Sequence, residues 1–450
     1  MAPRLESFGR ATPGANRSIG IAEVLAAPPG AMTRWQSMLP YGNGRSYGDS
    51  CQAASGTVID MRGANRILAF DAATGVLEAE AGAMLPDVIA HAAPQGWFPA
   101  VVPGTQFVTL GGAVANDIHG KNHHRRGTFG CHVESFRLLR SDGTTYHCTP
   151  TQNADLFAAT IGGMGLTGII LTVTLRLLRV PSLDIAEQVT PFAGLSEYFD
   201  LAEAADDANE YAVAWIDQLA TGKAEGRGLL MTGNHAEAGA RAASPAGGLL
   251  SVPLQPPFNV LNRPFLTLFN KAYHWRKGSG SRARKSGYQG FFFPLDGVRN
   301  WNRLYGPKGL FQHQSVVPFD AARAIVPKLL AAARDAGQGS FLTVLKRFGS
   351  VASPGIVSFP RPGYTLTLDF PNGGARTLAL LSQLDDIVID AGGAINPYKD
   401  ARMSPKTFAR SFPDWGRLET RRDPAFLSAF WQRTALRLAS HDGRMARAAA

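Results

Sequence analysis

The sequence predicts an α+β protein built from two domains that pack closely together. Its 450 residues are more than one simple hydrophobic core usually holds. Residues 31–180 alternate short apolar runs with glycine-rich turns and short helical stretches. After Pro181 the apolar strands are longer and the glycine loops fewer. We therefore place the boundary between the two domains at this proline.

Composition and charge narrow the class of protein. Apolar residues make up 45% of the chain and charged residues 18%, which is typical of a globular protein rather than a disordered one. The net charge of +10 favours an anionic ligand, a nucleic acid or an acidic membrane surface, without choosing among them. No run of about 18 apolar residues is present, so a membrane-spanning helix is not predicted.

The cysteines and the N-terminal residues bear on the compartment. Cys51, Cys131 and Cys148 form an odd set without metal-type spacing, so we expect no disulfide framework and a reducing environment. The N-terminal residues lack the apolar core of a signal peptide. These features predict a cytoplasmic protein, and peripheral contact with a membrane is compatible with them.

Short apolar runs and turn residues define the elements of the first domain. A short helix, IAEVLAAP, precedes the loop at 41–49, YGNGRSYGD, whose three glycines let the backbone approach a ligand closely. TVIDM predicts a strand. RILAFDAATGVLEAEAG predicts a hairpin, because the AATG step separates two apolar runs.

The rest of the first domain continues this mixture. MLPDVIAHAAPQG has helical spacing with an Asp in its first turn, and Trp97 to Val102 predicts a short strand that ends at Pro103. VESFRLLRSDGTTYHCTP predicts two strands joined by Ser-Asp-Gly, and NADLFAATIG predicts a helix. GIILTVTLRLLRV predicts a long strand after a further glycine cluster.

The second domain shows longer elements. YAVAWID and RGLLMTG predict strands, whereas residues 236–290 are expected to form an irregular, mobile excursion that is both basic and apolar. SVVPF, AARAIVPKLLAAARDAG, SFLTVLKRFG and YTLTLDFP then predict a strand–helix–strand pattern, followed by the helix ARTLALLSQLDDIVIDAGG. Amphipathic helices are expected near the C-terminus.

The stretch from Pro103 to Cys131, PGTQFVTLGGAVANDIHGKNHHRRGTFGC, holds the densest group of glycine and polar residues. It predicts a strand, a glycine-rich turn, a short helix and a polar loop. A glycine-rich turn that leads into a helix presents backbone N–H groups to an anion. We therefore expect this stretch at the centre of a cofactor site.

Three histidines in that stretch invite a metal interpretation. His119, His123 and His124 could reach one ion from a helix, but no carboxylate or cysteine accompanies them at a familiar spacing. The adjacent lysine and two arginines would repel a cation. No metal site is predicted.

Three glycine loops together resemble the flavin domain of FAD-linked oxidases of the vanillyl-alcohol-oxidase or PCMH type. The loops are YGNGRSYGDS, PGTQFVTLGGAVANDIHGKNHH and GGMGLTGII. The segments WNRLYGPKG, FQHQSVVP, FLTVLKRFG and PYKDAR extend the likeness over roughly residues 35 to 440. Within the family, the likeness is to the branch that oxidises polyprenyl-phosphoryl-β-D-ribose.

The resemblance implies a domain plan. Residues 1–180 would form a PCMH-type FAD-binding domain of two α+β sub-domains. Residues 181–405 would form a substrate domain with an antiparallel sheet flanked by helices. Residues 406–450 would form C-terminal helices that pack back on the FAD domain.

The resemblance also carries FAD-binding positions onto the three loops. The first loop contributes Gly42, Asn43, Gly44, Arg45, Ser46 and Tyr47. The second contributes Gly104, Thr105, Gly111, Gly112, Asn116, Ile118 and His119. The third contributes Gly163, Gly165, Gly168 and Ile169. Covalent members of the wider fold use a histidine just before the serine of the first loop. Arg45 occupies that position here, so we expect non-covalent FAD.

On the substrate side, the resemblance implies Lys399, His119, Tyr47, Lys346 and Gln314. A lysine among apolar strand residues, such as Lys346, either faces solvent or is buried for a reason. Gln314 and its neighbour Gln312 alternate along a strand, so both point to one face.

Two positions depart from the family pattern. Thr367 replaces a cysteine of the mycobacterial members, and Asn396 replaces an aromatic residue before PYKD, with Tyr398 two residues on. Both positions are expected on the substrate side of the site, away from the FAD loops.

These features predict an FAD-dependent oxidoreductase that converts a secondary hydroxyl of a sugar-like substrate to a ketone. The substrate implied by the resemblance is the 2-hydroxyl of a polyprenyl-phosphoryl-β-D-ribose, with a separate NADH-dependent reductase completing the epimerisation to arabinose. Lys399, His119, Tyr47 or a water could take the hydroxyl proton. The alternatives are an aldonolactone- or alditol-type oxidase of a free sugar, and a flavin-binding partner protein without turnover.

The basic run KGSGSRARKSG at 277–287 has two interpretations besides a solvated loop. It lacks the interleaved aromatic residues and reading motif of a nucleic-acid binder, so nucleic-acid binding is not predicted. Contact with a lipid headgroup or a membrane surface is favoured by the nearby aromatic residues Phe258, Phe265, Phe269 and Trp275.

Overall fold

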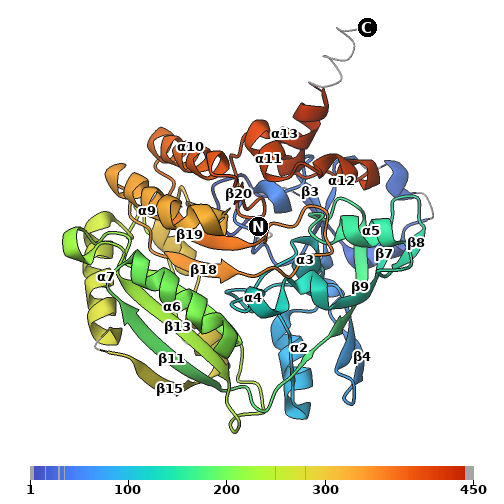
Figure 1. Ribbon diagram of the computed structural model, residues 1–450. Helices are drawn as coiled ribbons and strands as arrows, with labels where there is room; N and C mark the ends of the chain where they lie inside the picture. Colours follow the sequence, from blue (N-terminus) through green and yellow to red (C-terminus); the bar gives the residue numbers. More distant parts are fainter. Residues whose placement is uncertain are drawn as a thin grey trace.

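The computed structural model describes residues 5–440 except 16, 29, 30, 35, 249 and 279. Residues 1–4 and 441–450 of the expected domain plan therefore lie outside the described part. The described strands form two large antiparallel sheets and three small ones, with helices packed against them (Figure 1). The α+β class is confirmed.

The first part of the chain contains a small parallel sheet and a larger antiparallel one. The parallel sheet has the order β1 (Arg17–Gly20), β3 (Thr57–Asp60), β2 (Leu39–Tyr41). The five-stranded sheet has the order β4 (Ile67–Asp71), β5 (Val76–Glu80), β9 (Ile169–Arg176), β7 (Val133–Leu139), β8 (Thr145–Cys148). The helices here are α1 (Ile21–Ala26), α2 (Leu85–Ala92), α3 (Leu110–Ala115), α4 (His123–Arg126) and α5 (Ala154–Thr160).

The strand expected over 97–102 is much shorter than predicted. β6 spans only Trp97–Phe98 and pairs with β10 (Leu178–Arg179). The next residue, Pro99, has no N–H to donate, so the ladder cannot continue through it. The chain from there to Pro103 runs as an irregular segment into the second glycine loop.

An eight-stranded antiparallel sheet organises the second part of the chain. Its order is β15 (Arg282–Ser286), β11 (Ile185–Phe192), β13 (Gly228–His235), β12 (Tyr211–Ile216), β18 (Val344–Phe348), β19 (Gly363–Pro371), β17 (Leu310–Val317), β20 (Ala394–Ile395). The helices α6 (Leu195–Ala208), α9 (Phe319–Asp335) and α10 (Ala375–Asp390) pack on one face of this sheet.

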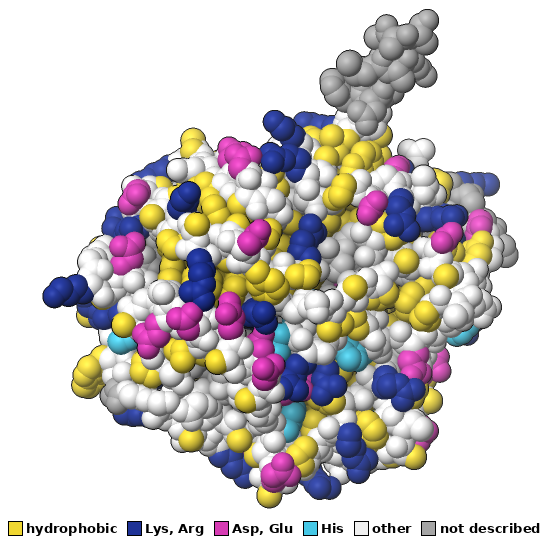
Figure 2. All heavy atoms as spheres, viewed as in Figure 1, with side chains coloured by type: hydrophobic (Ala, Val, Ile, Leu, Met, Phe, Trp, Pro, Cys, Tyr) yellow, Lys and Arg dark blue, Asp and Glu magenta, His cyan; other side chains and the backbone are white. Residues whose placement is uncertain are grey.

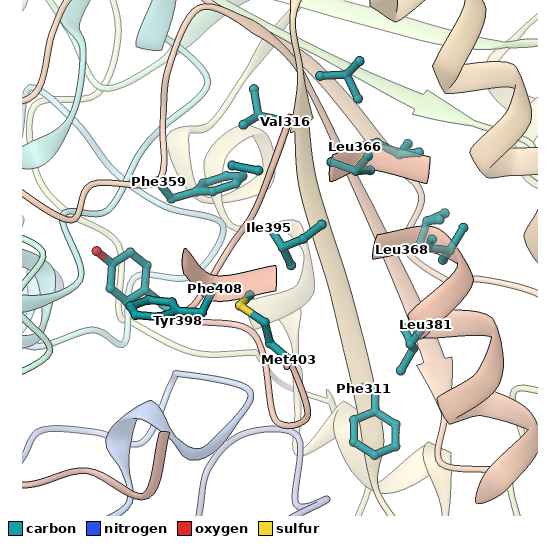
Figure 3. Packing of buried hydrophobic residues seen from close by; sticks show 14 of the residues in the cluster. Phe311, Val316, Phe359, Leu366, Leu368, Leu381, Ile395, Tyr398, Met403 and Phe408 are labelled. Carbon is teal, nitrogen blue, oxygen red and sulfur yellow. The ribbon is translucent and has the colours of Figure 1, made fainter. Parts of the chain in front are cut away.

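The alternation of strand residues gives this sheet two different faces. On β19, Leu366 and Leu368 belong to the core beneath the helices, whereas Thr367 lines a cavity on the other face. Figure 3 shows members of this core, among them Leu366, Leu368 and Ile395. The same sheet thus closes a hydrophobic core and presents polar groups.

The segment expected to be irregular over 236–290 contains regular structure in its second half. It holds helix α7 (Arg263–Lys277), edge strand β15 and helix α8 (Tyr288–Phe292). The side chain of Asn262 caps α7 by accepting from the Phe265 amide at 3.1 Å. The first half is irregular except for β14 (Leu250–Ser251), which pairs with β16 (Val298–Arg299).

The C-terminal helices lie against the first part of the chain. They are α11 (Pro405–Ser411), α12 (Trp415–Arg421) and α13 (Ala429–Arg433). Arg433 forms an ion pair with Asp49 at 2.7 Å, and the Met38 amide donates to the Ala425 carbonyl.

The molecular surface mixes charges on the side shown in Figure 2, where Lys and Arg side chains are interspersed with Asp and Glu. None of the helices within the described ranges is both long and apolar enough to cross a bilayer.

Candidate functional site

A cavity of about 760 Å³ is lined by residues from both large sheets and from the loops between them. Its size falls within the ~300–1,000 Å³ typical of ligand sites. From the first two loops it is lined by Gly42, Asn43, Gly44, Arg45, Ser46, Tyr47, Gly104, Thr105, Gly111, Gly112, Asn116, Ile118 and His119. From the third loop Gly165 and Gly168 line it, and from the second part of the chain Lys346, Gln314 and Lys399. Segments far apart in the sequence therefore meet at one cavity.

Two residues expected in the third loop do not line the cavity. Ile169 is fully buried, and its neighbour Ile170 on β9 faces the cavity instead, because successive strand residues point to opposite faces. A Cβ on Gly163 would meet the Ala159 carbonyl oxygen at 2.1 Å, so this glycine packs against α5. The adjacent Met164 takes its place in the wall. Gly163 and Ile169 thus lie behind the cavity wall, and their predicted contact with FAD stays a prediction.

The first and second loops are locked together. A Cβ on Gly42 would meet the Thr109 hydroxyl oxygen at 2.3 Å, so only glycine allows this approach. The Asn43 side-chain amide donates to the Phe107 carbonyl at 2.9 Å. Thr109 in turn caps α3 by accepting from the Gly112 amide at 3.2 Å. The two loops therefore form one preformed wall.

Arg45 supplies an unsatisfied donor in that wall. Its guanidinium lies 5.5 Å from the ring centroid of Phe8 and 5.4 Å from that of Phe107. Its Nε is buried without a hydrogen-bond partner. Burial lowers the pKa of Arg45, although the nearby Asp296 opposes this. A half-buried cation with an unpaired Nε beside a glycine loop fits the diphosphate of a dinucleotide.

The backbone at Gly104 borders open space, because a Cβ there would meet no atom within 4 Å. The loop around it is held by Asp296, from the second part of the chain. This carboxylate accepts from the Thr105 hydroxyl at 2.7 Å and from the Gln106 amide at 2.8 Å. The sequence offers no local signal for Asp296, since its partners lie about 190 residues earlier.

A chain of hydrogen bonds sets the orientation of His119. The Tyr398 amide donates to Asn396 Oδ1 at 2.9 Å, and Asn396 Nδ2 donates to Gln314 Oε1 at 2.8 Å. Gln314 Nε2 therefore faces His119 Nε2, at 3.1 Å, as a donor. Burial holds the pKa of His119 well below its usual value. The neutral ring then accepts at Nε2 and carries its proton on Nδ1.

Lys346 lies on the other side of this ring. Its Nζ is 3.2 Å from His119 Nδ1, and burial lowers its pKa to about 7. A protonated Nδ1 can donate only to a lone pair, so the geometry favours the neutral amine of Lys346. The pair places an uncharged imidazole and an uncharged amine side by side in the cavity wall.

Lys399 and Tyr47 form a second group. Lys399 Nζ lies 4.3 Å from the centroid of the Tyr47 ring. Burial lowers the pKa of Lys399 to about 8, and the carboxylate of Asp369 partly opposes the shift. Burial also raises the pKa of Asp369 to about 7, while Gln312 Nε2 donates to it at 2.5 Å. Lys399 can therefore release and bind a proton near neutral pH. Sequence reasoning did not single out Asp369.

The remaining histidines have separate partners. His123 Nδ1 accepts from the Gly349 amide at 3.2 Å, and His124 Nε2 lies 3.0 Å from the Asn209 carbonyl oxygen. Among the described residues, no group of three or more His, Cys, Asp or Glu side chains could hold a metal ion. Lys121 donates to the Phe291 carbonyl and does not line the cavity.

Comparison with known proteins agrees with this geometry. A family model described as an FAD binding domain matches residues 23–149. The chain is 34% identical over 439 residues to the decaprenylphosphoryl-beta-D-ribose oxidase of Mycolicibacterium smegmatis, covering 94% of each protein. It is 35% identical over 366 residues to an uncharacterized protein of Streptomyces coelicolor, covering 77% of this chain and 96% of that protein. It is 30% identical over 195 residues to the L-gulonolactone oxidase of Mus musculus, covering 43% and 42%.

The residues of the cavity fit the cofactor that this similarity names. The partnerless Nε of Arg45 and the open backbone at Gly104 can receive an anionic dinucleotide, and the locked first and second loops provide its wall. Sequence similarity over nearly the full length, with a matching FAD domain, leaves one conclusion. The chain belongs to the FAD-linked oxidases of the PCMH type and is an FAD-dependent oxidoreductase.

Proposed function

We propose that this enzyme oxidises a secondary hydroxyl of a sugar-like substrate to a ketone, and that the hydroxyl is the 2-hydroxyl of a polyprenyl-phosphoryl-β-D-ribose. The observation that carries the proposal is the 34% identity over 94% of the chain to an oxidase named for decaprenylphosphoryl-ribose. A separate NADH-dependent reductase would then consume the ketone and complete the epimerisation to arabinose. That reductase is the partner we propose.

The second-domain residues supply the acid–base chemistry. Bound FAD supplies the acceptor for the hydride that leaves the carbinol carbon. Lys399, whose pKa of about 8 makes the neutral amine accessible, takes the hydroxyl proton. Gln314, held by Asn396, is fixed in orientation on the wall, and the neutral His119–Lys346 pair lies next to it. The loops Gly42–Tyr47 and Gly104–His119 bind the cofactor.

We propose that the FAD is not covalently attached. Arg45 precedes Ser46 at the position where covalent members carry a histidine, and a guanidinium does not form that bond. Acid precipitation of the purified holoenzyme is expected to release FAD into the supernatant. Flavin that stays with the pellet would contradict this.

Anaerobic mixing of the holoenzyme with candidate substrates tests the reaction. We expect polyprenyl-phosphoryl-β-D-ribose to bleach the flavin absorbance, and the free sugars to leave it unchanged. Similarity to an L-gulonolactone oxidase makes an aldonolactone oxidase the second candidate. Bleaching by a free aldonolactone or alditol alone would support that activity instead. Failure of every alcohol to bleach the flavin would leave a binding protein without turnover.

A further inference from the structure

One segment of the second domain differs in charge from the rest of the chain. Between Glu237 and Asp296 the sequence has eight Lys and Arg residues and no Asp or Glu. Elsewhere, basic and acidic side chains are mixed over the face shown in Figure 2. The segment contains β14, α7, β15 and α8.

Helix α7 is fixed to the sheet by one face only. Leu266 is buried in the core, and Asn270 Nδ2 donates to the buried Asp217 Oδ1 at 2.9 Å. The ring of Tyr273 packs against Trp215 with 4.8 Å between centroids. In Figure 1, α7 runs along the left edge of the molecule, outside the sheet. These contacts position the helix and leave its opposite face exposed.

The outward face of α7 is apolar and flanked by cations. Pro264, Leu268, Ala272 and Trp275 follow one another at helical spacing, and Leu268 and Trp275 are 70% and 82% exposed. We call these four residues the α7 ridge. Beside it, Arg263 and Lys271 line a shallow depression of about 420 Å³ together with Pro264, Thr267 and Leu268. An amphipathic helix whose exposed face is apolar with basic borders suits a lipid–water interface.

A second exposed apolar stretch adjoins the wall of the cavity. Leu250, Leu254 and Phe258 are 67%, 78% and 65% exposed, and they lie shortly before α7 in the sequence. Leu250 is paired with Val298 between β14 and β16, and Val298 lines the cavity. The apolar stretch is therefore joined directly to the site. Apolar side chains grouped this way on a surface indicate an interaction site.

Charge decides which kind of partner fits. Arg284 and Lys285 are paired with Glu187 and Asp184, but within the described part of the chain no ion pair engages Arg263, Lys271 or Arg276. A second copy of the same surface would bring like charges together and is disfavoured. An anionic lipid surface offers negative headgroups to the cations and hydrocarbon to the ridge.

We propose that the α7 ridge and residues 250–258 form a docking surface for an anionic lipid bilayer. Docking there holds the β16 wall of the cavity next to the membrane. This docking surface rests on the proposed function, because the proposed substrate, a polyprenyl-phosphoryl sugar, resides in a bilayer. The binding itself is independent of turnover and is measured separately.

Co-sedimentation of the holoenzyme with vesicles tests the surface. We expect binding to phosphatidylcholine vesicles that contain phosphatidylglycerol, little binding to phosphatidylcholine alone, and weaker binding as salt is added. The double variant Lys271→Glu/Arg276→Glu is expected to bind at least about tenfold more weakly, since each Lys or Arg near such a surface contributes about 1 kcal/mol. The double variant Leu268→Ser/Trp275→Ser is expected to lose a similar factor, because it removes the apolar contact.

Matched controls on other helices separate docking from general effects. Leu378→Ser removes an exposed leucine from α10, and Lys328→Glu reverses an exposed lysine on α9. Both are expected to bind vesicles as the wild type does. All variants are expected to oxidise substrate dispersed in detergent at the wild-type rate, because no altered side chain lines the cavity.

Three results would overturn the docking surface. They are wild-type protein that ignores anionic vesicles, ridge variants that bind as well as the controls, and self-association that depends on the ridge in place of vesicle binding. Turnover of dispersed substrate without vesicle binding would remove the docking surface and leave the proposed function. Vesicle binding by a protein that does not oxidise the lipid-linked sugar would support the docking surface and contradict the proposed function.

Discussion

Among single residues, burial governs the charge states at the site. Lys346 and Lys399 have no carboxylate within ion-pair distance among the described residues, and burial lowers their pKa values to about 7 and about 8. His119 is held neutral for the same reason. A cluster of basic groups that would repel one another in water is thus stable as neutral or half-charged groups. This property makes proton transfer near neutral pH accessible.

Replacing Lys399 by Met tests its role as the proton acceptor. The neutral amine becomes more abundant as the pH rises through its pKa of about 8, so the rate of anaerobic FAD reduction by substrate should rise with pH and level off above about 8. The variant should keep its FAD, lose about 10²–10⁴-fold in rate and lose that inflection. Stopped-flow absorbance over a pH series measures both effects.

Lys121→Met is the matched control. Lys121 is also a buried lysine, with a pKa lowered by burial to about 7, but it does not line the cavity. Its variant should keep the inflection near pH 8. A wild-type rate that falls as the pH rises through 8 would mean that the charged form of Lys399 acts, and the assignment as a base would be wrong.

At the level of elements, the glycine loops place backbone where a side chain would intrude. Gly42 is required by the close approach of Thr109, whereas Gly104 has open space beyond its Cα. The two glycines therefore have different consequences. Substitution at Gly42 disturbs the packing of two loops, and substitution at Gly104 places a methyl group in the space available to the cofactor.

Gly104→Ala should therefore fold normally and bind FAD less tightly. The added methyl is expected to weaken binding by about 1–3 kcal/mol, the usual range for overpacking, while the melting temperature of the apoprotein stays unchanged. Gly297→Ala is the control, because its Cβ also meets no atom within 4 Å but the residue does not line the cavity. FAD titration by fluorescence quenching compares the two. Equal affinities would show that Gly104 does not face the cofactor.

Some elements could be predicted from sequence and others could not. The hairpin at 67–80 and the strand of Gln312 and Gln314 follow from local apolar periodicity, and the structure has both. Helix α7 lies between proline-rich residues on its N-terminal side and a glycine-rich basic run on its C-terminal side, and these flanks predict an irregular chain. The strand predicted at 97–102 ends at Phe98 because Pro99 has no N–H to continue the ladder.

Across the whole molecule, the C-terminal segment ties the two parts of the chain together. Arg433 of α13 lies between two buried carboxylates, Asp49 near the first loop and Asp400 beside Lys399. Its distances to them are 2.7 Å and 2.5 Å. This bridge links the segment of the proposed base to the loop that contains Tyr47.

Loss of that bridge should destabilise the protein as a whole. Arg433→Ala leaves Asp49 buried without its ion-pair partner and leaves Asp400 with only the ion pair to Arg402. This is expected to cost about 3–5 kcal/mol of unfolding free energy. Arg410→Ala removes an exposed ion pair with Asp390 and should cost less than about 1 kcal/mol. Urea unfolding of the two holoenzyme variants measures the difference. Similar losses for both would mean that the bridge contributes no more than a surface pair.

The amino-acid sequence alone was sufficient to predict the family, the three glycine loops and most of the polar residues around the cavity. These depend on local patterns: glycine spacing, strand alternation, and lysines set among apolar neighbours. Only the tertiary structure shows that Asp296 and Asp369 contact residues of the site. It also shows that Ile170, and not Ile169, lines the cavity, and that Lys121 donates to the Phe291 carbonyl outside it. Such contacts join residues far apart in the chain or depend on strand register. The pKa shifts arise from burial, which exists only once the folded chain encloses the cavity.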